Sequence, residues 1–179
     1  MIDLPREGNR RFRQGEFSRD PAYYGALVEG QSPEVLWIGC ADSRVAVDRI
    51  TDSRPGQVFV HRNVANVVGF NDNNLGAVLT YALVHLAIRD VIVCGHTHCG
   101  GLAALTAGVD DPVIADWLNL AALALRRLEA FDPDRRLDAD TRMELLAALN
   151  VRLQLEHLEQ FSVVRRVRER DDSLQLHGL

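Results

Sequence analysis

The chain has 179 residues, 47% of them apolar and 25% charged, with a formal net charge of -5 at pH 7. Its basic residues are dispersed, which argues against the basic patch of a nucleic-acid-binding protein. Its apolar runs are shorter than the roughly 20 residues of a membrane span, and residues 1–6 lack the apolar core of a signal peptide. We therefore expect a single domain over residues 1–179 in the cytoplasm, with no nucleic-acid or membrane partner.

The chain alternates between helical and extended segments. A polar helical arm is predicted within residues 1–30. Short apolar runs predict strands at residues 35–39, 57–61, 90–94 and 173–177. Helices are predicted over residues 71–86, 112–130, 141–160 and 162–169. This alternation predicts an α/β fold whose central parallel four-stranded sheet, in the order 2-1-3-4, is flanked by helices.

Three of the predicted helices have recognisable starting signals. Residues 71–74 read Asn-Asp-Asn-Asn and are rich in capping side chains. Asp111 precedes Pro112, which is the expected order of an N-cap and a first helical residue. Thr141 and Glu144 have the spacing of a capping box, which predicts that the long helix begins at Thr141.

Chemically active side chains follow two of the predicted strands. Cys40, Asp42 and Arg44 come after the first strand, and His96 and Cys99 come after the third. With the strand order 2-1-3-4, both segments reach the crevice where α/β sheets bind ligands. Clustered thiols in a reducing compartment are more often metal ligands or catalytic groups than disulfides. Since zinc favours thiolate and imidazole, we predict one Zn²⁺ ion held by Cys40, His96 and Cys99.

Asp42 and Arg44 are predicted to control the fourth position of that zinc ion. Two thiolates and one neutral imidazole would cancel the charge of Zn²⁺, and a bound water could then ionise near pH 7. Asp42 could close on the metal as a fourth ligand and exclude this water. Alternatively, Arg44 could hold Asp42 through a bidentate pair, oriented to accept a hydrogen bond from the zinc-bound hydroxide. Both residues are therefore candidate catalytic residues.

The neighbouring residues favour simpler interpretations. Cys94 is expected to be a buried core residue, and His98 is expected to face solvent or to pack. Gly100 and Gly101 would allow the backbone to approach the ion or a substrate closely.

Three segments together resemble the β-class carbonic anhydrases. They are Cys40–Val45, His61–Asn66 and Val93–Gly101, and their order and spacing match that family as well. The resemblance extends from about Gly8 to Gly178. It implies the same zinc ligands, the Asp42–Arg44 dyad, and the activity of a carbonate dehydratase, a zinc lyase that converts CO₂ and water reversibly to bicarbonate and a proton.

The resemblance also implies a pocket for CO₂ or bicarbonate that is completed across a homodimer interface. Its implied lining residues are Gln31, Phe59, Val64 and Tyr81, with Gly100 beside them. The Gln31 amide would position the substrate, and the other side chains would keep the pocket largely apolar.

A regulatory site is implied by the self-inhibited type II branch of bacterial-type relatives. Trp37 and Arg62 match two positions that hold a regulatory bicarbonate in that branch. The third member, a Tyr, would lie beyond the final residues Leu176–Leu179, and so would the usual C-terminal antiparallel edge strand of the family. This difference leaves the choice between dimer and tetramer open. It also leaves open an inactive zinc-bound oligomeric scaffold as an alternative function. A carbonyl sulfide or carbon disulfide hydrolase with the same metal site is a second alternative, because that choice depends on access to the pocket.

Overall fold

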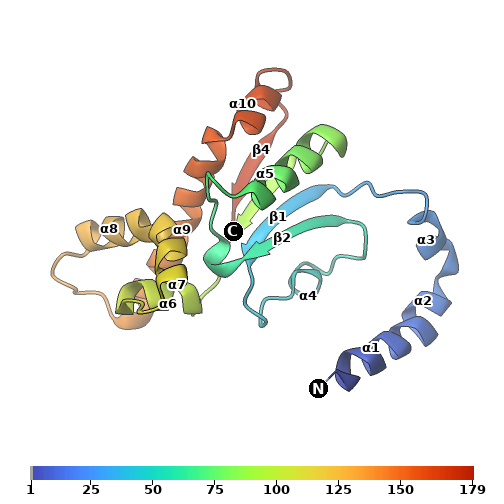
Figure 1. The fold of residues 1–179 in the computed structure, drawn as a ribbon, viewed down its shortest axis with the longest axis horizontal. Coiled ribbons are helices and arrows are strands. Elements are labelled where there is room, and N and C mark those ends of the chain that lie inside the picture. Colours follow the sequence, from blue (N-terminus) through green and yellow to red (C-terminus); the bar gives the residue numbers. More distant parts are fainter. Residues whose placement is uncertain (1) are drawn as a thin grey trace. The chain divides into compact units, whose positions relative to one another are not determined.

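The computed structural model describes residues 2–179 and divides into two compact units, Met1–Ser32 and Pro33–Leu179. The first unit consists of the helices α1 (Asp3–Gln14), α2 (Glu16–Arg19) and α3 (Pro21–Ala26) (Figure 1). Aromatic rings hold these helices together, since the ring centroids of Phe17 and Tyr24 lie 4.9 Å apart and Phe12 packs edge-on against Tyr24. The assignment of both units to one domain stays a prediction.

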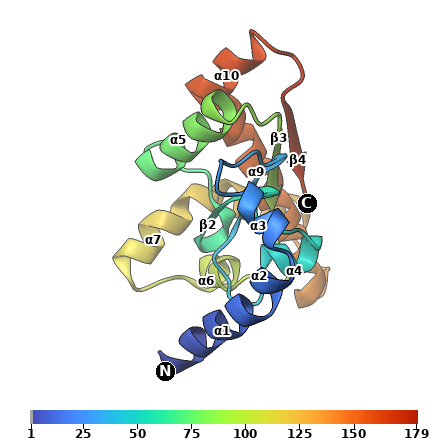
Figure 2. The same ribbon diagram turned by 90° about the vertical axis from the view of Figure 1, so that its right-hand side faces the viewer.

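The second unit is built on a four-stranded sheet in the order β2-β1-β3-β4. Its strands are β1 (Val35–Cys40), β2 (Val58–Asn63), β3 (Asp90–Cys94) and β4 (Gln175–Gly178). All three pairings are parallel, which confirms the predicted fold class and strand order. Figure 2 shows β3 and β4 side by side. Cys40 pairs with Asn63 across β1 and β2, so the carboxyl ends of these strands lie at one edge of the sheet.

Strand β1 is the centre of the hydrophobic core because it is covered on both faces. Leu36 and Ile38 point to one face and are fully buried. They belong to the same core cluster as buried residues of the helices α5 (Asn73–Thr80), α9 (Ala139–Gln160) and α10 (Ser162–Arg168). Trp37 points to the opposite face, as expected from the alternation of side chains along a strand, and packs with Val47 and Cys94. This two-sided burial explains why β1 is a continuous apolar run.

Helices and short helical turns connect and cover the strands. They are α4 (Val47–Thr51), η1 (Val64–Asn66), α5 (Asn73–Thr80), η2 (Tyr81–His85), α6 (Gly100–Ala107), α7 (Pro112–Leu118), η3 (Asn119–Ala121), α8 (Ala122–Phe131), α9 (Ala139–Gln160) and α10 (Ser162–Arg168). The sequence did not predict α4, and the single helix predicted over 112–130 is interrupted at η3. No helix within residues 2–179 is both long enough and apolar enough to span a bilayer.

The N-termini of the helices confirm two of the three predicted starting signals. Asp72 caps α5 and Asp111 caps α7, each through a carboxylate that accepts backbone N–H groups. The prediction of a capping box at Thr141 was wrong, because α9 begins two residues earlier and Asp138 is its N-cap. Asp138 accepts hydrogen bonds from the Thr141 backbone N–H at 2.9 Å and from the Thr141 hydroxyl at 2.7 Å. Thr141 therefore donates hydrogen bonds to the N-cap residue Asp138 and is not the N-cap itself.

We predict that Asp138→Ala will lower the free energy of unfolding by about 1 kcal/mol, because the first turn of α9 loses its carboxylate acceptor. Urea denaturation measures this change. Glu144→Ala is the matched control on the same helix and should leave stability within about 0.5 kcal/mol of the parent. If Glu144→Ala proved the more destabilising of the two, the assignment of the cap to Asp138 would be wrong.

Candidate metal centre

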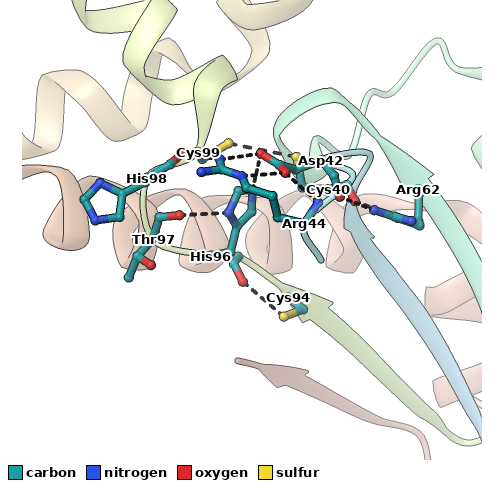
Figure 3. A network of polar contacts seen from close by, with 10 residues as sticks. Cys40, Asp42, Arg44, Arg62, Cys94, His96, Thr97, His98 and Cys99 are labelled. Carbon is teal, nitrogen blue, oxygen red and sulfur yellow. Dashed lines mark hydrogen bonds and ion pairs between the residues drawn. The ribbon is translucent and has the colours of Figure 1, made fainter. Parts of the chain in front are cut away.

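The two segments predicted to converge do meet at the carboxyl edge of the sheet. Cys40 is the last residue of β1, His96 follows β3, and Cys99 immediately precedes α6. The ligand atoms of these three residues all lie within 4.8 Å of one another, and the two sulfur atoms are 3.9 Å apart (Figure 3). The structure thus brings the three predicted ligands, Cys40, His96 and Cys99, into one group that could hold a metal ion, and this set of side chains is called the donor group below.

The geometry and chemistry of this group fit a metal ion. Tetrahedral zinc with Zn–S bonds near 2.3 Å places two thiolates about 3.8 Å apart, and the observed separation is 3.9 Å. The His96 Nε2 atom is buried without a hydrogen-bond partner. The His96 Nδ1 atom lies 2.8 Å from the Thr97 carbonyl oxygen. If Nδ1 carries the proton and donates it there, the lone pair on Nε2 is left available to a metal.

The two thiols differ in acidity because they form a hydrogen bond with each other. This bond lowers the pKa of Cys40 well below its usual value, and backbone N–H groups of Asp42 and Ala65 lower it further. The same bond, together with burial, raises the pKa of Cys99. A bound cation would displace the proton of this hydrogen bond, because metal ligands must be deprotonated.

Asp42 and Arg44 form the predicted bidentate pair beside this group. Arg44 Nε donates to Asp42 Oδ1 at 2.9 Å, and Arg44 Nη2 donates to Asp42 Oδ2 at 2.6 Å. These bonds and the backbone N–H of Arg44 hold the pKa of the Asp42 carboxyl well below its usual range. Asp42 Oδ2 also lies 3.9 Å from His96 Nε2. Asp42 is thus paired with Arg44 here, and its role as a fourth metal ligand stays a prediction.

Two arginines hold the loops around the group in place (Figure 3). Arg44 Nη2 also donates to the His98 carbonyl at 2.9 Å, which links the loop after β1 to the loop after β3. Arg62 Nε donates to the Cys40 carbonyl at 2.7 Å, and Arg62 Nη2 donates to the Asp42 carbonyl at 2.5 Å. Both guanidinium groups therefore position the backbone on which the metal-binding side chains sit.

The predicted regulatory site is only partly described by these contacts. Arg62 is engaged with two backbone carbonyls. Trp37 is buried, and its indole nitrogen has no hydrogen-bond partner. A bicarbonate role for Trp37 and Arg62 stays a prediction.

Three of the predicted pocket residues present apolar surface. The rings of Phe59 and Tyr81 pack with centroids 5.8 Å apart. Tyr81 is 45% exposed and Val64 is 39% exposed, so both are available to line a pocket. Gly100 begins α6 directly after Cys99. Gln31 belongs to the first unit, and its place in the pocket stays a prediction.

The neighbouring thiol and imidazole behave as the sequence predicted. Cys94 is buried, its S–H donates to the Gly95 carbonyl at 3.1 Å, and burial raises its pKa. The side chain of His98 is exposed and its ring points away from the other donors in Figure 3.

Sequence reasoning missed the residues that shape the turn η1, which covers Val64–Asn66. Ala65 and Asn66 adopt left-handed backbone conformations, with φ values of 61° and 47°. The Trp117 indole N–H donates to the Val64 carbonyl at 2.8 Å. On the other side, the Asn150 side chain donates to the Ala65 carbonyl at 3.0 Å. The available signal was Asn150 itself, a polar residue within the apolar stripe of a long helix.

Helix α6 approaches η1 closely at Gly101. A Cβ atom placed on Gly101 would lie 3.0 Å from the Ala65 Cβ and 3.1 Å from the Val64 Cγ1, whereas a Cβ atom on Gly100 would meet nothing within 4 Å. The Ala65 Cβ is attached directly to the backbone and cannot move aside alone. Gly101 is therefore required for this approach, and Gly100 is not.

We predict that Gly101→Ala will lower the free energy of unfolding by about 1–3 kcal/mol, because the added methyl group overpacks the contact with η1. Gly100→Ala, one residue earlier in the same helix, is the matched control. It should keep or slightly raise stability, because alanine favours the helix over glycine. Chemical denaturation of both variants tests this contrast. Equal stability of the two variants would contradict it.

Comparisons with known proteins agree with this geometry. The sequence profile of the family described as "Carbonic anhydrase" matches residues 35–179. A carbonic anhydrase from Emericella nidulans is 36% identical over 176 residues, covering 96% of this chain and 75% of its own length. One from Synechocystis sp. is 38% identical over 179 residues, covering 96% of this chain but 64% of its own length. A solved structure from a study of two tetrameric β-carbonic anhydrases of Sordaria macrospora superposes with a TM-score of 0.91 at 34% identity, covering 99% of this chain and 89% of that one. The chain therefore belongs to the carbonic anhydrase family, in its β class.

Proposed function

We propose that this protein is a zinc enzyme that catalyses the reversible hydration of CO₂ to bicarbonate and a proton. The observation that supports this most directly is the convergence of Cys40, His96 and Cys99 next to the Asp42–Arg44 pair, in a chain of the carbonic anhydrase family.

The donor set supports zinc as the cofactor, with one ion per chain. Two sulfurs and one imidazole nitrogen are typical of zinc sites, and three protein ligands leave a fourth position for chemistry. When bound, zinc supplies a positive charge that brings the ionisation of water close to neutral pH. Cys40, His96 and Cys99 would hold it, with the two thiols deprotonated.

Asp42 is proposed to orient the reacting water. Its carboxylate is kept ionised by Arg44, and its Oδ2 atom faces the donor group at 3.9 Å from His96 Nε2. A carboxylate in this state can only accept hydrogen bonds. It would therefore take a hydrogen bond from the water at Oδ2 and direct the oxygen lone pair toward the carbon of CO₂. Arg44 holds the carboxylate at this orientation through two bonds.

An apolar surface near the donor group is proposed to receive CO₂, which is itself apolar. Val64 belongs to η1, whose Ala65 packs in one buried cluster with Cys40, and the Phe59–Tyr81 pair lies on β2 and η2. These side chains would also limit access of bulk water. The exposed backbone at Gly100 would then help to position bicarbonate.

A homo-oligomer is proposed as the active assembly. The Sordaria macrospora relative comes from a study of tetrameric enzymes. In this chain, Val60 on the edge strand β2 and Tyr81 and Val84 on η2 are large apolar side chains that are between 44% and 54% exposed, and such surface favours association. Sedimentation equilibrium should give at least twice the 19.9 kDa mass of one chain. A monomer at micromolar concentration would contradict this proposal.

The decisive test combines metal content with stopped-flow CO₂ hydration. The purified protein should contain one zinc per chain and hydrate CO₂ rapidly. Cys40→Ser should lose most of the zinc and the activity together, because the thiolate is a direct ligand. Arg44→Met should retain the zinc but lose about 10–100-fold in kcat, as expected when a group supporting the site is removed.

Arg165→Met is the matched control for Arg44→Met, because it removes a similar charge from the exposed face of α10. It should change neither the zinc content nor the rate. Full zinc occupancy without hydration of CO₂ would overturn the proposed function. Release of sulfide from carbonyl sulfide or carbon disulfide, with poor hydration of CO₂, would replace it with the hydrolase alternative.

A further inference from the structure

Helix α9 presents two fully buried amide side chains to the sheet edge that carries the donor group. Asn150 and Gln154 are both 0% exposed and stand one helical turn apart. The Gln154 Nε2 group donates to Asn150 Oδ1 at 2.8 Å, so the two side chains form one linked pair. Burial of polar groups is costly unless their hydrogen bonds are made, so such a pair requires a reason beyond filling the core.

The bonds of this pair that leave the helix all go to the backbone just after β2. Asn150 Nδ2 donates to the Ala65 carbonyl at 3.0 Å, and the Val68 backbone N–H donates to Gln154 Oε1 at 2.8 Å. One turn further along the helix, the ring nitrogen Nδ1 of His157 lies 3.1 Å from the Val68 carbonyl oxygen. The amide pair thus holds the backbone on both sides of the bend at Ala65 and Asn66.

The backbone bend at Ala65 and Asn66 is unfavourable by itself and requires stabilising contacts. Ala65 and Asn66 are consecutive residues with positive φ values, 61° and 47°. A side chain with a Cβ atom disfavours this region, and asparagine tolerates it better than alanine does. Left to itself, the chain would relax toward an extended conformation at Ala65. The bond from Asn150 to the Ala65 carbonyl opposes that relaxation directly.

The position of the bend matters for the donor group on its other side. Ala65 packs with Cys40 and Cys99 in one buried cluster. Ala65 and Val64 also lie close to Gly101, two residues after Cys99. A rotation of the peptide at Ala65 would therefore disturb the packing against Cys40 and move Val64 relative to the loop that carries Cys99.

We propose that Asn150 and Gln154 are positioning residues for the reaction. From the rigid helix α9 they hold the left-handed bend at Ala65, and through it they set how Ala65 packs against Cys40 and where Val64 lies beside the donor group. This role rests on the proposed function. Neither residue touches the donor atoms, so the effect passes entirely through the bend.

The test measures zinc affinity and the environment of the Cys40 sulfur in parallel. Asn150→Leu keeps the side-chain volume but removes the bond to Ala65, and Gln154→Met keeps the length but removes the bonds to Val68 and Asn150. Each should raise the zinc dissociation constant, measured by competition with a chromophoric chelator, by about 10-fold. Each should also shift the sulfur-to-metal charge-transfer absorption of the cobalt-substituted protein, because the environment of the Cys40 sulfur changes.

Leu174→Ala is the control for a loss of stability alone. Leu174 is buried in the core at the amino end of β4, at the edge of the sheet opposite to the donor group. This variant should lower the melting temperature without moving the cobalt absorption or the zinc dissociation constant. If Asn150→Leu does not fold, Gln154→Met decides the question by the same two measurements.

The inference would be overturned if a folded Asn150→Leu or Gln154→Met variant matched the parent in zinc affinity and cobalt absorption, and only its melting temperature fell. It would also be overturned if Leu174→Ala shifted the absorption equally. Failure of the proposed function looks different, because then the parent protein itself would bind zinc without hydrating CO₂, or would not bind zinc at all.

Discussion

The structure depends on the hydrogen-bonded contact between two sulfur atoms that are 59 residues apart in the chain. Cys40 and Cys99 can approach to 3.9 Å only because β1 and β3 are parallel neighbours whose carboxyl ends share one edge of the sheet. The hydrogen bond between these thiols lowers the pKa of Cys40 and raises that of Cys99. The contact is therefore understandable as half of a cation site, with the unpartnered Nε2 of His96 completing it.

Around this contact, the protein uses side chains chiefly to hold backbone. Arg62 binds the carbonyl groups of Cys40 and Asp42, and Arg44 reaches the carbonyl group of His98 while holding Asp42. The indole of Trp117 and the amide of Asn150 bind the carbonyl groups of Val64 and Ala65. A metal site requires ligands placed within a few tenths of an ångström, and fixing the loops that carry them is the direct way to reach that accuracy.

The fold and the convergence of Cys40, His96 and Cys99 were predictable from the sequence because both follow from local patterns. The apolar runs at β1 and β3 are continuous, since those strands are buried between layers, and parallel topology then brings Cys40, His96 and Cys99 together. The start of α9 was not predictable in this way. Asp138 and Thr141 both carry capping side chains, and only the folded chain shows that the threonine donates to the aspartate.

The roles of the amide pair and of the bend at Ala65 could not be predicted from the sequence, for a tertiary reason, although Asn150 interrupts an apolar stripe. Alanine has no preference for positive φ, so nothing local marks position 65 as a bend. Asn150 and Gln154 look like ordinary polar interruptions of a helix until their partners, 85 and 86 residues away, are known. Contacts of this kind are specified by the packing of α9 on the sheet edge.

The tight contact between Ala65 and Gly101 ties the two positions together in any change of sequence. With a methyl group already present at position 65, position 101 has room for hydrogen only. A glycine at position 65 would remove the closest of these contacts and would also accept the left-handed backbone more readily. The Val64 Cγ1 atom would still lie 3.1 Å from a Cβ atom at position 101, so room for a methyl group there requires a change at Val64 as well as at Ala65.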